Sequence, residues 1–244
     1  MFDLHCHFLP GIDDGAKDIS ESLDLACYAV KSGITHAILT PHIHQGRFHN
    51  DRLSIYESFK VFQQALLDNQ IPLKVGFAAE VRIDHEIIDW VEQGIIPFLG
   101  RKQEQDVMLL ELPHSHIPAG TENMVKWLLS KNIVPIIAHP ERNKEIMKEP
   151  RKILPLYNLG CLFQLTAGAV AGNFGDVSRS TAEDLLKNGL VHILASDAHN
   201  LKHRPPELEP GRIAAEKIIG ESASWDLVIS NPRTIAEQHF NDRL

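Results

Sequence analysis

The sequence alternates between short, unbroken apolar runs and longer amphipathic segments, and this alternation limits the possible folds more than any other feature. Runs such as AILT and IVPIIA lack the polar residue at every second position that marks a strand with one face in water. They are typical of parallel strands that are covered on both faces. We predict strands at residues 2–5, 37–40, 74–81, 107–112, 133–138, 162–166 and 191–195.

The segments between these runs carry apolar residues at helical spacing, as Leu23, Ala26, Cys27 and Val30 do. We predict helices at residues 20–31, 51–67, 85–92, 121–129, 151–159, 181–187, 211–219 and 224–228. This alternation predicts an α/β fold, and at 244 residues the sheet is long enough to close into a barrel. A doubly wound open sheet is the alternative architecture. Since no linker or block of charge divides the chain, we expect one domain over residues 1–244.

Composition argues against several classes of protein. The net charge is −8, whereas a protein that binds nucleic acid without sequence preference needs a basic surface. No apolar run approaches the roughly 20 residues of a membrane span, and the N-terminus lacks the basic and apolar regions of a signal peptide. The three cysteines, Cys6, Cys27 and Cys161, are too few for a disulfide framework, which favours a reducing, cytoplasmic location.

Residues able to bind a metal ion lie at the ends of six of the seven predicted strands. The carboxyl ends of parallel strands meet on one face of an α/β fold, where active sites are built. The topology therefore brings nine candidate ligands to one rim. They are five histidines, His5, His7, His42, His139 and His199, and four acids, Asp14, Glu80, Glu111 and Asp197.

The spacing and chemistry of these residues suit a metal centre. His5 and His7 are two residues apart, as are Asp197 and His199, so on extended backbone both members of a pair point the same way. Imidazole and carboxylate without thiolate suit zinc, manganese or iron, and many oxygen ligands favour manganese. Three divalent ions, if bound, would outweigh four carboxylates and attract an anionic substrate.

Each of these residues also has a purely structural interpretation. Glu80 and Glu111 could form salt bridges at the rim, and His42 and His139 could cap strands. However, an unpaired carboxylate inside an apolar run is costly. The same bias at six separate strand ends therefore favours a metal centre.

The remaining histidines are weaker candidates. His36 and His192 precede strands, so we expect them on the opposite rim. His114 and His116 stand in a loop bounded by prolines, and solvent or substrate contact suits them better than ligation. Those that could line the entrance are His44, His49 and His203.

Two arginines close to the candidate ligands suggest that the substrate carries a phosphate. Arg142 follows His139 by three residues and Arg204 follows His199 by five. A guanidinium group grips phosphate through two hydrogen bonds, so both could form a phosphate clamp, with Arg47 a weaker third candidate. No cysteine has an arginine six residues later, and neither a GxSxG elbow nor a phosphate-binding GxxxxGK[ST] loop occurs. A hydroxide held by metal ions is then the remaining attacking group.

Seven segments together resemble the polymerase and histidinol phosphatase (PHP) superfamily. They are DLHCHFLPGIDDGA, TPHIHQGRF, AAEVRI, LLELP, IIAHPERN, QLTAGAVAGNFG and ASDAHN followed by RPP. Within it, the chain is most similar to the bacterial manganese-dependent protein-tyrosine phosphatases encoded with capsule and exopolysaccharide genes. The resemblance extends from Phe2 to about Arg233 and implies a distorted seven-stranded (β/α) barrel with three metal ions.

The resemblance also implies a role for each candidate residue. It assigns His5, His7, Glu80 and Asp197 to one ion, Glu80, Glu111 and His139 to a second, and Asp14, His42 and His199 to a third. Arg142 and Arg204 fall where the family has phosphate-binding arginines. Glu111 favours the tyrosine phosphatases, because the histidinol phosphatases often have histidine there.

The expected reaction is hydrolysis of phosphotyrosine by in-line attack of a metal-bound hydroxide. The expected substrate is the tyrosine-rich tail of an autophosphorylating kinase that controls capsule synthesis. Two alternatives are a small-molecule phosphoesterase, such as a histidinol phosphatase, and a non-catalytic scaffold stabilised by metal. The sequence leaves open the metal, the general acid, the oligomeric state and the roles of Arg47, His44, His114 and His116.

Overall fold

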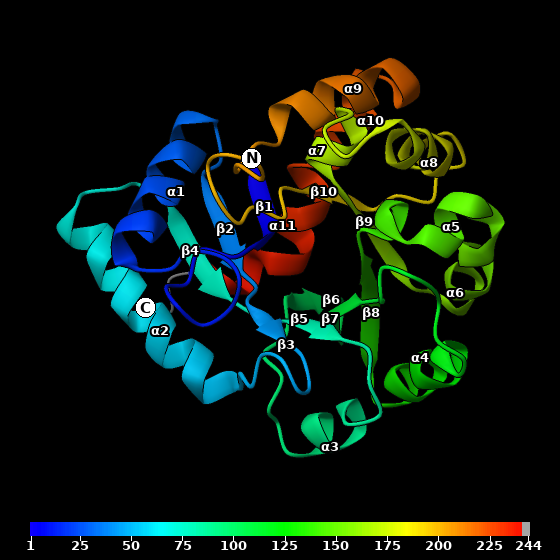
Figure 1. Cartoon of the computed structure of the whole chain (residues 1–244), viewed down its shortest axis with the longest axis horizontal. Coiled ribbons are helices and arrows are strands. Elements are labelled where there is room, and N and C mark those ends of the chain that lie inside the picture. Colours follow the sequence, from blue (N-terminus) through cyan, green and yellow to red (C-terminus); the bar gives the residue numbers. More distant parts are fainter. Residues whose placement is uncertain (241–244) are drawn as a thin grey trace.

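Parallel strands occupy the centre of the molecule and helices surround them (Figure 1) in the computed structural model, which describes residues 1–240. The strands are β1 (Phe2–Cys6), β2 (His36–Leu39), β3 (His42–Ile43), β4 (Lys74–Phe77), β5 (Glu80–Arg82), β6 (Gly100–Lys102), β7 (Gln105–Glu111), β8 (Ile133–Ala138), β9 (Leu162–Thr166) and β10 (Ile193–Ala195).

The helices lie mainly between successive strands along the chain, and the last of them follow β10. The α-helices are α1 (Ile19–Lys31), α2 (Arg52–Asp68), α3 (Ile87–Glu92), α4 (Thr121–Ser130), α5 (Lys144–Lys148), α6 (Leu154–Leu159), α7 (Ala167–Val170), α8 (Asp176–Lys187), α9 (Glu209–Ile219), α10 (Glu221–Asp226) and α11 (Ser230–Ala236). Short 3₁₀ helices are η1 (Pro140–Arg142), η2 (Pro150–Ile153) and η3 (Glu237–His239). No helix within residues 1–240 is both long enough and apolar enough to cross a membrane.

Two sheets join into a ring of parallel strands. One has the order β1-β2-β4 and the other β10-β9-β8-β7-β5-β3, with β6 antiparallel to β7. The chain passes from β2 into β3 and from β4 into β5, so the sheets meet there, where the Ala78 N–H donates to the Leu39 carbonyl at 2.8 Å. Hydrogen bonds of 2.8 Å from the Asp197 N–H to the His5 carbonyl and from the His7 N–H to the Ala198 carbonyl link β1 to the end of β10. The predicted distorted barrel is confirmed.

Apolar side chains fill the barrel below its carboxyl-terminal rim. Leu109 of β7 and Ile136 of β8 belong to an interior cluster, while their neighbours Leu110 and Ile137 belong to the larger core that includes residues of the helices. This alternation follows the two-residue period of a strand. Ile235 of α11 joins the interior cluster, so the last α-helix covers the closed end of the barrel. The opposite, carboxyl-terminal end is the end that α11 leaves uncovered.

The structure breaks two of the predicted elements and adds others that the prediction lacked, among them β3, β6, α5, α7 and α11. The single strand predicted at 74–81 divides into β4 and β5, and the helix predicted at 151–159 is 3₁₀ in its first part, η2, and α-helical in α6. The antiparallel β6 is an addition that the prediction lacked. Its turn to β7 holds Gln103 with a φ of 56°, a left-handed backbone that glycine or asparagine usually marks. Because glutamine carries no such signal, the hairpin could not be recognised.

We predict that Gly211→Ala destabilises the protein. A Cβ atom at this position of α9 would lie 2.5 Å from the Ala167 carbonyl oxygen of α7, so the two helices would have to separate. Overpacking of this kind costs about 1–3 kcal/mol. The melting temperature should fall by roughly 2–4 °C for each kcal/mol, measured by calorimetry. Lys217→Ala, an exposed change on the same helix, should alter stability by less than about 0.5 kcal/mol, and equal melting temperatures for both variants would contradict the prediction.

Candidate metal centre

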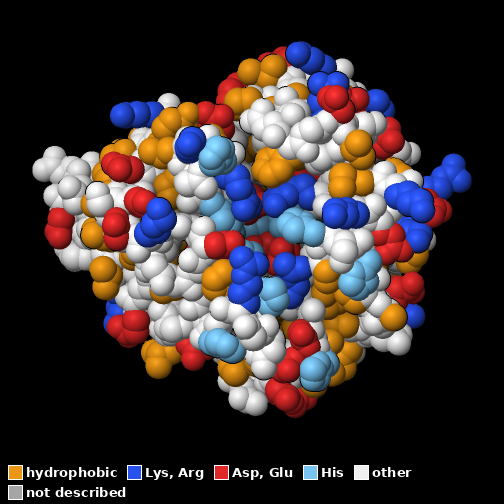
Figure 2. Space-filling view, viewed as in Figure 1, with side chains coloured by type: hydrophobic (Ala, Val, Ile, Leu, Met, Phe, Trp, Pro, Cys, Tyr) orange, Lys and Arg blue, Asp and Glu red, His pale blue; other side chains and the backbone are white. Residues whose placement is uncertain are grey.

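The structure brings all nine candidate ligands together at the carboxyl-terminal rim of the barrel. They form four overlapping groups in which the possible ligand atoms lie within 4.8 Å of one another. The groups are His7, Asp14, His42 and His199; His5, His7 and Glu80; His5, His139 and Asp197; and His42, Glu80 and Glu111. Figure 2 shows a hollow at the centre of this face, where histidine, basic and acidic side chains meet.

One side of the cluster centres on His5. Its Nε2 atom lies 3.2 Å from Glu80 Oε2, 3.2 Å from Asp197 Oδ1 and 3.2 Å from His7 Nε2. The register of β1 shifts between Asp3 and Cys6, so Leu4 can join the interior apolar cluster while its neighbour His5 reaches the polar rim. An irregularity of this type re-aims side chains within a strand.

Glu80 is the shared residue of the cluster. Its Oε1 atom lies 2.9 Å from His139 Nε2, and its Oε2 atom lies 2.9 Å from His42 Nδ1. Glu111 approaches the same two histidines at 3.8 and 3.9 Å. A carboxylate whose two oxygens face different sets of histidines has the geometry needed to bridge two cations.

Asp14 connects the third part of the cluster. Its Oδ1 atom lies 3.3 Å from His42 Nε2 and 3.5 Å from His199 Nε2. The side chain of Asp14 is 40% exposed, whereas the other eight residues are buried. This part of the cluster is therefore the one most open to solvent.

Burial and mutual charge shift the pKa values of the cluster in opposite directions. Burial, followed by repulsion from Glu80, raises the pKa of Glu111 to about 7. Burial, followed by the positive charge of Arg142, lowers the pKa of His139 to about 3. For His42, burial is outweighed by the carboxylates of Glu80 and Asp14, and its pKa rises to about 10. The buried histidines therefore neutralise only part of the negative charge of the carboxylates in the cluster.

Several buried ligand atoms make no hydrogen bond to any residue of the described chain, 1–240. They are His42 Nδ1, Glu80 Oε2, Glu111 Oε2, Asp197 Oδ1 and His199 Nε2. Leaving such atoms unpaired inside a protein is costly. Since each can donate a lone pair toward the same hollow, the donor set fits divalent cations. Its nitrogen and oxygen atoms suit manganese, iron or zinc.

Cys6 lies between two of the histidines but stays out of the cluster. Its thiol is fully buried and lies 3.6 Å from the Ile38 carbonyl oxygen. Burial, reinforced by the charges of Asp3 and Asp197, raises the pKa of this thiol well above its usual value. It therefore remains a neutral thiol, which is a poor metal ligand.

Three further residues orient the candidate ligands. The sequence alone did not assign them to the site. His7 Nδ1 lies 2.6 Å from Asp13 Oδ2 and His5 Nδ1 lies 2.9 Å from Gln164 Oε1. Arg82 donates one hydrogen bond of 3.1 Å to Glu111 Oε1, and its Nε atom lies 2.9 Å from Glu111 Oε2 in an ion pair. Partners of this kind fix the ring orientation and the tautomer of a metal-binding histidine. A signal for Gln164 exists, because it is a polar residue in the apolar strand LFQLT.

Arg142 and Arg204 both donate hydrogen bonds to Asp197 Oδ2. Burial would raise the pKa of Asp197, but His5 and these two arginines hold it well below its usual range. Asp197 has a φ of 52° and His139 a φ of 34°, both in the left-handed region that is uncommon for residues other than glycine. Such strain is tolerated where the surrounding structure fixes it, and it concentrates at functional sites.

The weaker candidates occupy the rim or lie elsewhere. Arg47 is 58% exposed and lies 3.4 Å from Asp14, while the ring of His114 is 6.0 Å from that of His139. His36 stacks on Phe2 at the start of β2, which confirms its place on the opposite rim.

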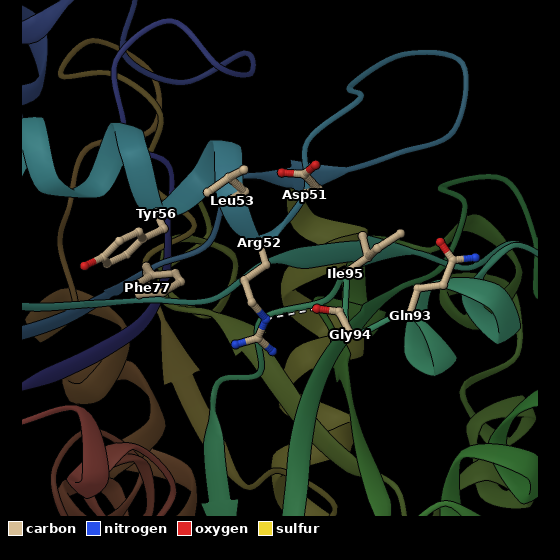
Figure 3. Close-up of a pocket in the computed structure, with 8 residues that line it drawn as sticks. All are labelled: Asp51, Arg52, Leu53, Tyr56, Phe77, Gln93, Gly94 and Ile95. Atoms are coloured by element: carbon tan, nitrogen blue, oxygen red, sulfur yellow. Dashed lines mark hydrogen bonds between the residues drawn. The ribbon is translucent and has the colours of Figure 1, made fainter.

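A separate hollow of about 400 Å³ lies between the start of α2, β4 and the loop after α3 (Figure 3). Arg52 crosses it and donates to the Gly94 carbonyl at 3.0 Å, and the rings of Tyr56 and Phe77 lie side by side on its wall. None of the nine clustered residues lines this hollow, so it is separate from the candidate metal centre.

Comparison with known proteins agrees with the metal chemistry. The family described as "Capsular polysaccharide synthesis, CpsB/CapC" matches residues 1–237. Tyrosine-protein phosphatase YwqE of Bacillus subtilis is 35% identical over 93% of this chain and 88% of its own. Tyrosine-protein phosphatase CpsB of Streptococcus pneumoniae is 27% identical over 96% and 98%. A crystal structure from a study of YwqE and CpsB, described as unique metal-dependent tyrosine phosphatases, superposes with a TM-score of 0.91 at 33% identity, covering 97% of this chain and 94% of that one.

We predict that divalent metal raises the melting temperature and that a chelator lowers it. Ions that bind only the folded state stabilise it by about 2.7 kcal/mol per site at 100 times the dissociation constant. In a chain of this size, that is a rise of roughly 5–10 °C per site. Glu80→Gln should reduce the rise because Glu80 is shared between groups, whereas the exposed Glu122→Gln on α4 should not. Melting temperatures that are identical with chelator and with manganese would refute the metal centre.

Proposed function

The chain belongs to the CpsB/CapC family of capsular polysaccharide synthesis, and on this basis we propose that it hydrolyses phosphotyrosine in proteins as a metal-dependent phosphatase. The observation that carries this proposal is the buried cluster of imidazoles and carboxylates next to two arginines. A hydrolase of phosphate esters needs a source of attacking water and positive charge around the phosphoryl group. The cluster and the arginines offer both.

We propose that the cluster holds three divalent ions, with manganese the best fit. As the family resemblance implies, His5, His7, Glu80 and Asp197 would hold one ion, Glu80, Glu111 and His139 a second, and Asp14, His42 and His199 a third. Contacts within each set support this division: His5 with Glu80 and Asp197, His139 with Glu80 and Glu111, and Asp14 with His42 and His199. Bound ions would activate water and neutralise charge on the phosphoryl group. The buried lone pairs without hydrogen bonds support this assignment.

Arg142 and Arg204 bind the phosphate oxygens in this proposal. Both guanidinium groups already converge on Asp197 Oδ2, so their donors are close together and held in place. The aromatic ring of Phe174 lies 4.8 Å from the Arg142 guanidinium and holds it further. An arriving phosphate would share these donors with Asp197 through its own oxygens.

The leaving group favours tyrosine over serine. A tyrosine hydroxyl has a pKa near 10, so its phenolate leaves with little help from a proton donor. With divalent ions bound next to Arg142 and Arg204, the site would stabilise the negative charge of a leaving phenolate, which matches an aryl phosphate. The open rim around the cluster gives access to a phosphorylated protein segment (Figure 2).

The physiological substrate that we propose is the tyrosine-rich tail of a bacterial tyrosine kinase that controls capsule or exopolysaccharide synthesis. The capsular context of the family supports this choice. We place the reaction in the cytoplasm, because all three cysteines are free thiols and two of them are fully or nearly fully buried.

The proposed function is tested by phosphate release from a phosphotyrosine peptide. We expect the chelated protein to be inactive and manganese to restore activity. We expect kcat/KM to be higher for the phosphotyrosine peptide than for histidinol phosphate. Release that does not depend on metal, or a preference for histidinol phosphate, would contradict the proposal, and specific binding to a kinase without hydrolysis would instead indicate a scaffold.

We predict that Arg142→Ala and Arg204→Ala each lower kcat/KM for the peptide by about 10²–10³-fold, since loss of one charge-stabilising donor has that effect in other enzymes. Arg179→Ala is the matched control, because Arg179 is half-exposed on α8 and pairs only with Glu183 among the described residues. Elemental analysis should show the same metal content in all three variants. Full activity of Arg142→Ala with normal metal content would remove the arginine from the phosphate site.

A further inference from the structure

An open groove of about 450 Å³ leads away from the candidate metal centre. Asp14 and His199 line its inner end and also belong to the nine clustered residues. The rest of its lining comes from the segment that enters α1, from α1 itself and from the turn after His199. The groove therefore adjoins the cluster, and a molecule whose phosphate sits at the cluster has this groove next to it.

The turn after His199 is held rigidly. The Asn200 side-chain oxygen accepts hydrogen bonds from the backbone N–H groups of Lys202 at 3.2 Å and of His203 at 2.8 Å. The Arg204 carbonyl accepts from the N–H groups of His199 at 3.0 Å and Asn200 at 3.2 Å. One short turn thus carries a groove wall and ends at an arginine that we assign to phosphate binding, so the spacing between the two is fixed.

Both apolar and charged side chains line the groove. Leu201 is 44% exposed and Leu25 is buried, and both line it. Lys17 is neutralised by Glu21 at 3.6 Å, whereas Lys202 makes no ion pair with any of residues 1–240. Asp24 of α1 lines the groove as well, so the turn carries a positive charge and the helix a negative one.

A neighbouring hollow is too small to take a side chain. It is lined by Phe174, His203 and Arg204 and has a volume of about 20 Å³. A space of this size holds about one water molecule. A protein segment next to the phosphate therefore has more room on the Leu201 side of the turn.

We infer that this groove binds the polypeptide that flanks the phosphotyrosine of the substrate, with an apolar side chain against Leu25 and Leu201 and an acidic side chain against Lys202. The inference rests on the proposed function and adds a sequence preference to it. Leu201 and Lys202 then determine which phosphorylated segments are hydrolysed fastest. Hydrolysis of free phosphotyrosine, which has no flanking residues, does not use them.

The test compares kcat/KM for phosphotyrosine peptides with that for free phosphotyrosine. Peptides with glutamate beside the phosphotyrosine should be preferred over matched lysine peptides by about two- to fivefold, as for an exposed ion pair. Lys202→Glu should abolish or reverse this preference. Leu201→Ser should lower the ratio of peptide to free phosphotyrosine kcat/KM by about fivefold, because part of a leucine contact is lost.

Lys217→Glu is the control, because it makes the same charge change on an exposed part of α9 and should leave the peptide preference as it is. Melting temperatures of the variants would identify a folding defect. If both groove variants keep the wild-type peptide ratio and charge preference, the groove inference is wrong while the phosphatase activity stands. If the wild-type protein with manganese hydrolyses no phosphotyrosine compound, the proposed function itself fails.

Discussion

Repulsion among buried carboxylates is the constraint on which the rest of this structure depends. Glu80, Glu111 and Asp197 are almost completely buried within one cluster, and the charge of Glu80 helps to raise the pKa of Glu111. Arginines offset part of this charge, through the ion pair of Arg82 with Glu111 and through the contacts of Arg142 with Asp197. The remaining negative charge of the carboxylates makes the rim favourable for cations. Bound cations would in turn attract a phosphate ester.

The barrel makes such a cluster possible by separating apolar and polar residues along the same strands. On β7 the inward row passes from Leu109 to Glu111, and on β9 it passes from Leu162 to Gln164. Within two residues, each strand thus passes from the packed interior to a candidate ligand or to a residue that orients one. β7 and β9 each pair with a neighbour on both sides, so Glu111 and Gln164 are placed by the sheet rather than by a loop.

The alternation of strands and helices together with the family resemblance predicted the barrel, and the rule that parallel strands end on one face predicted the convergence of the nine clustered residues. The sequence did not predict the partners of those residues. The bond between His5 and Gln164 joins β1 to β9, which are far apart in sequence, and depends on how the ring closes. Nor did it predict that Arg142 and Arg204 meet at Asp197, since the two arginines come from different segments that only the fold brings together. The sequence pattern predicts where each side chain lies along its strand. Its orientation depends on hydrogen bonds to residues that are distant in sequence and close only in the folded chain.

The placement of Cys6 has a consequence for oxidative stress. Phosphatases that attack with a cysteine thiolate must keep a reactive sulfur at the mouth of the active site, where peroxide can convert it to a sulfenic acid. Here the one cysteine beside the candidate centre is fully buried behind the histidines and kept as a neutral thiol. Within residues 1–240 the cysteine nearest the rim is therefore shielded from solvent, and we expect peroxide to oxidise it more slowly than the exposed thiolate of a cysteine-dependent phosphatase.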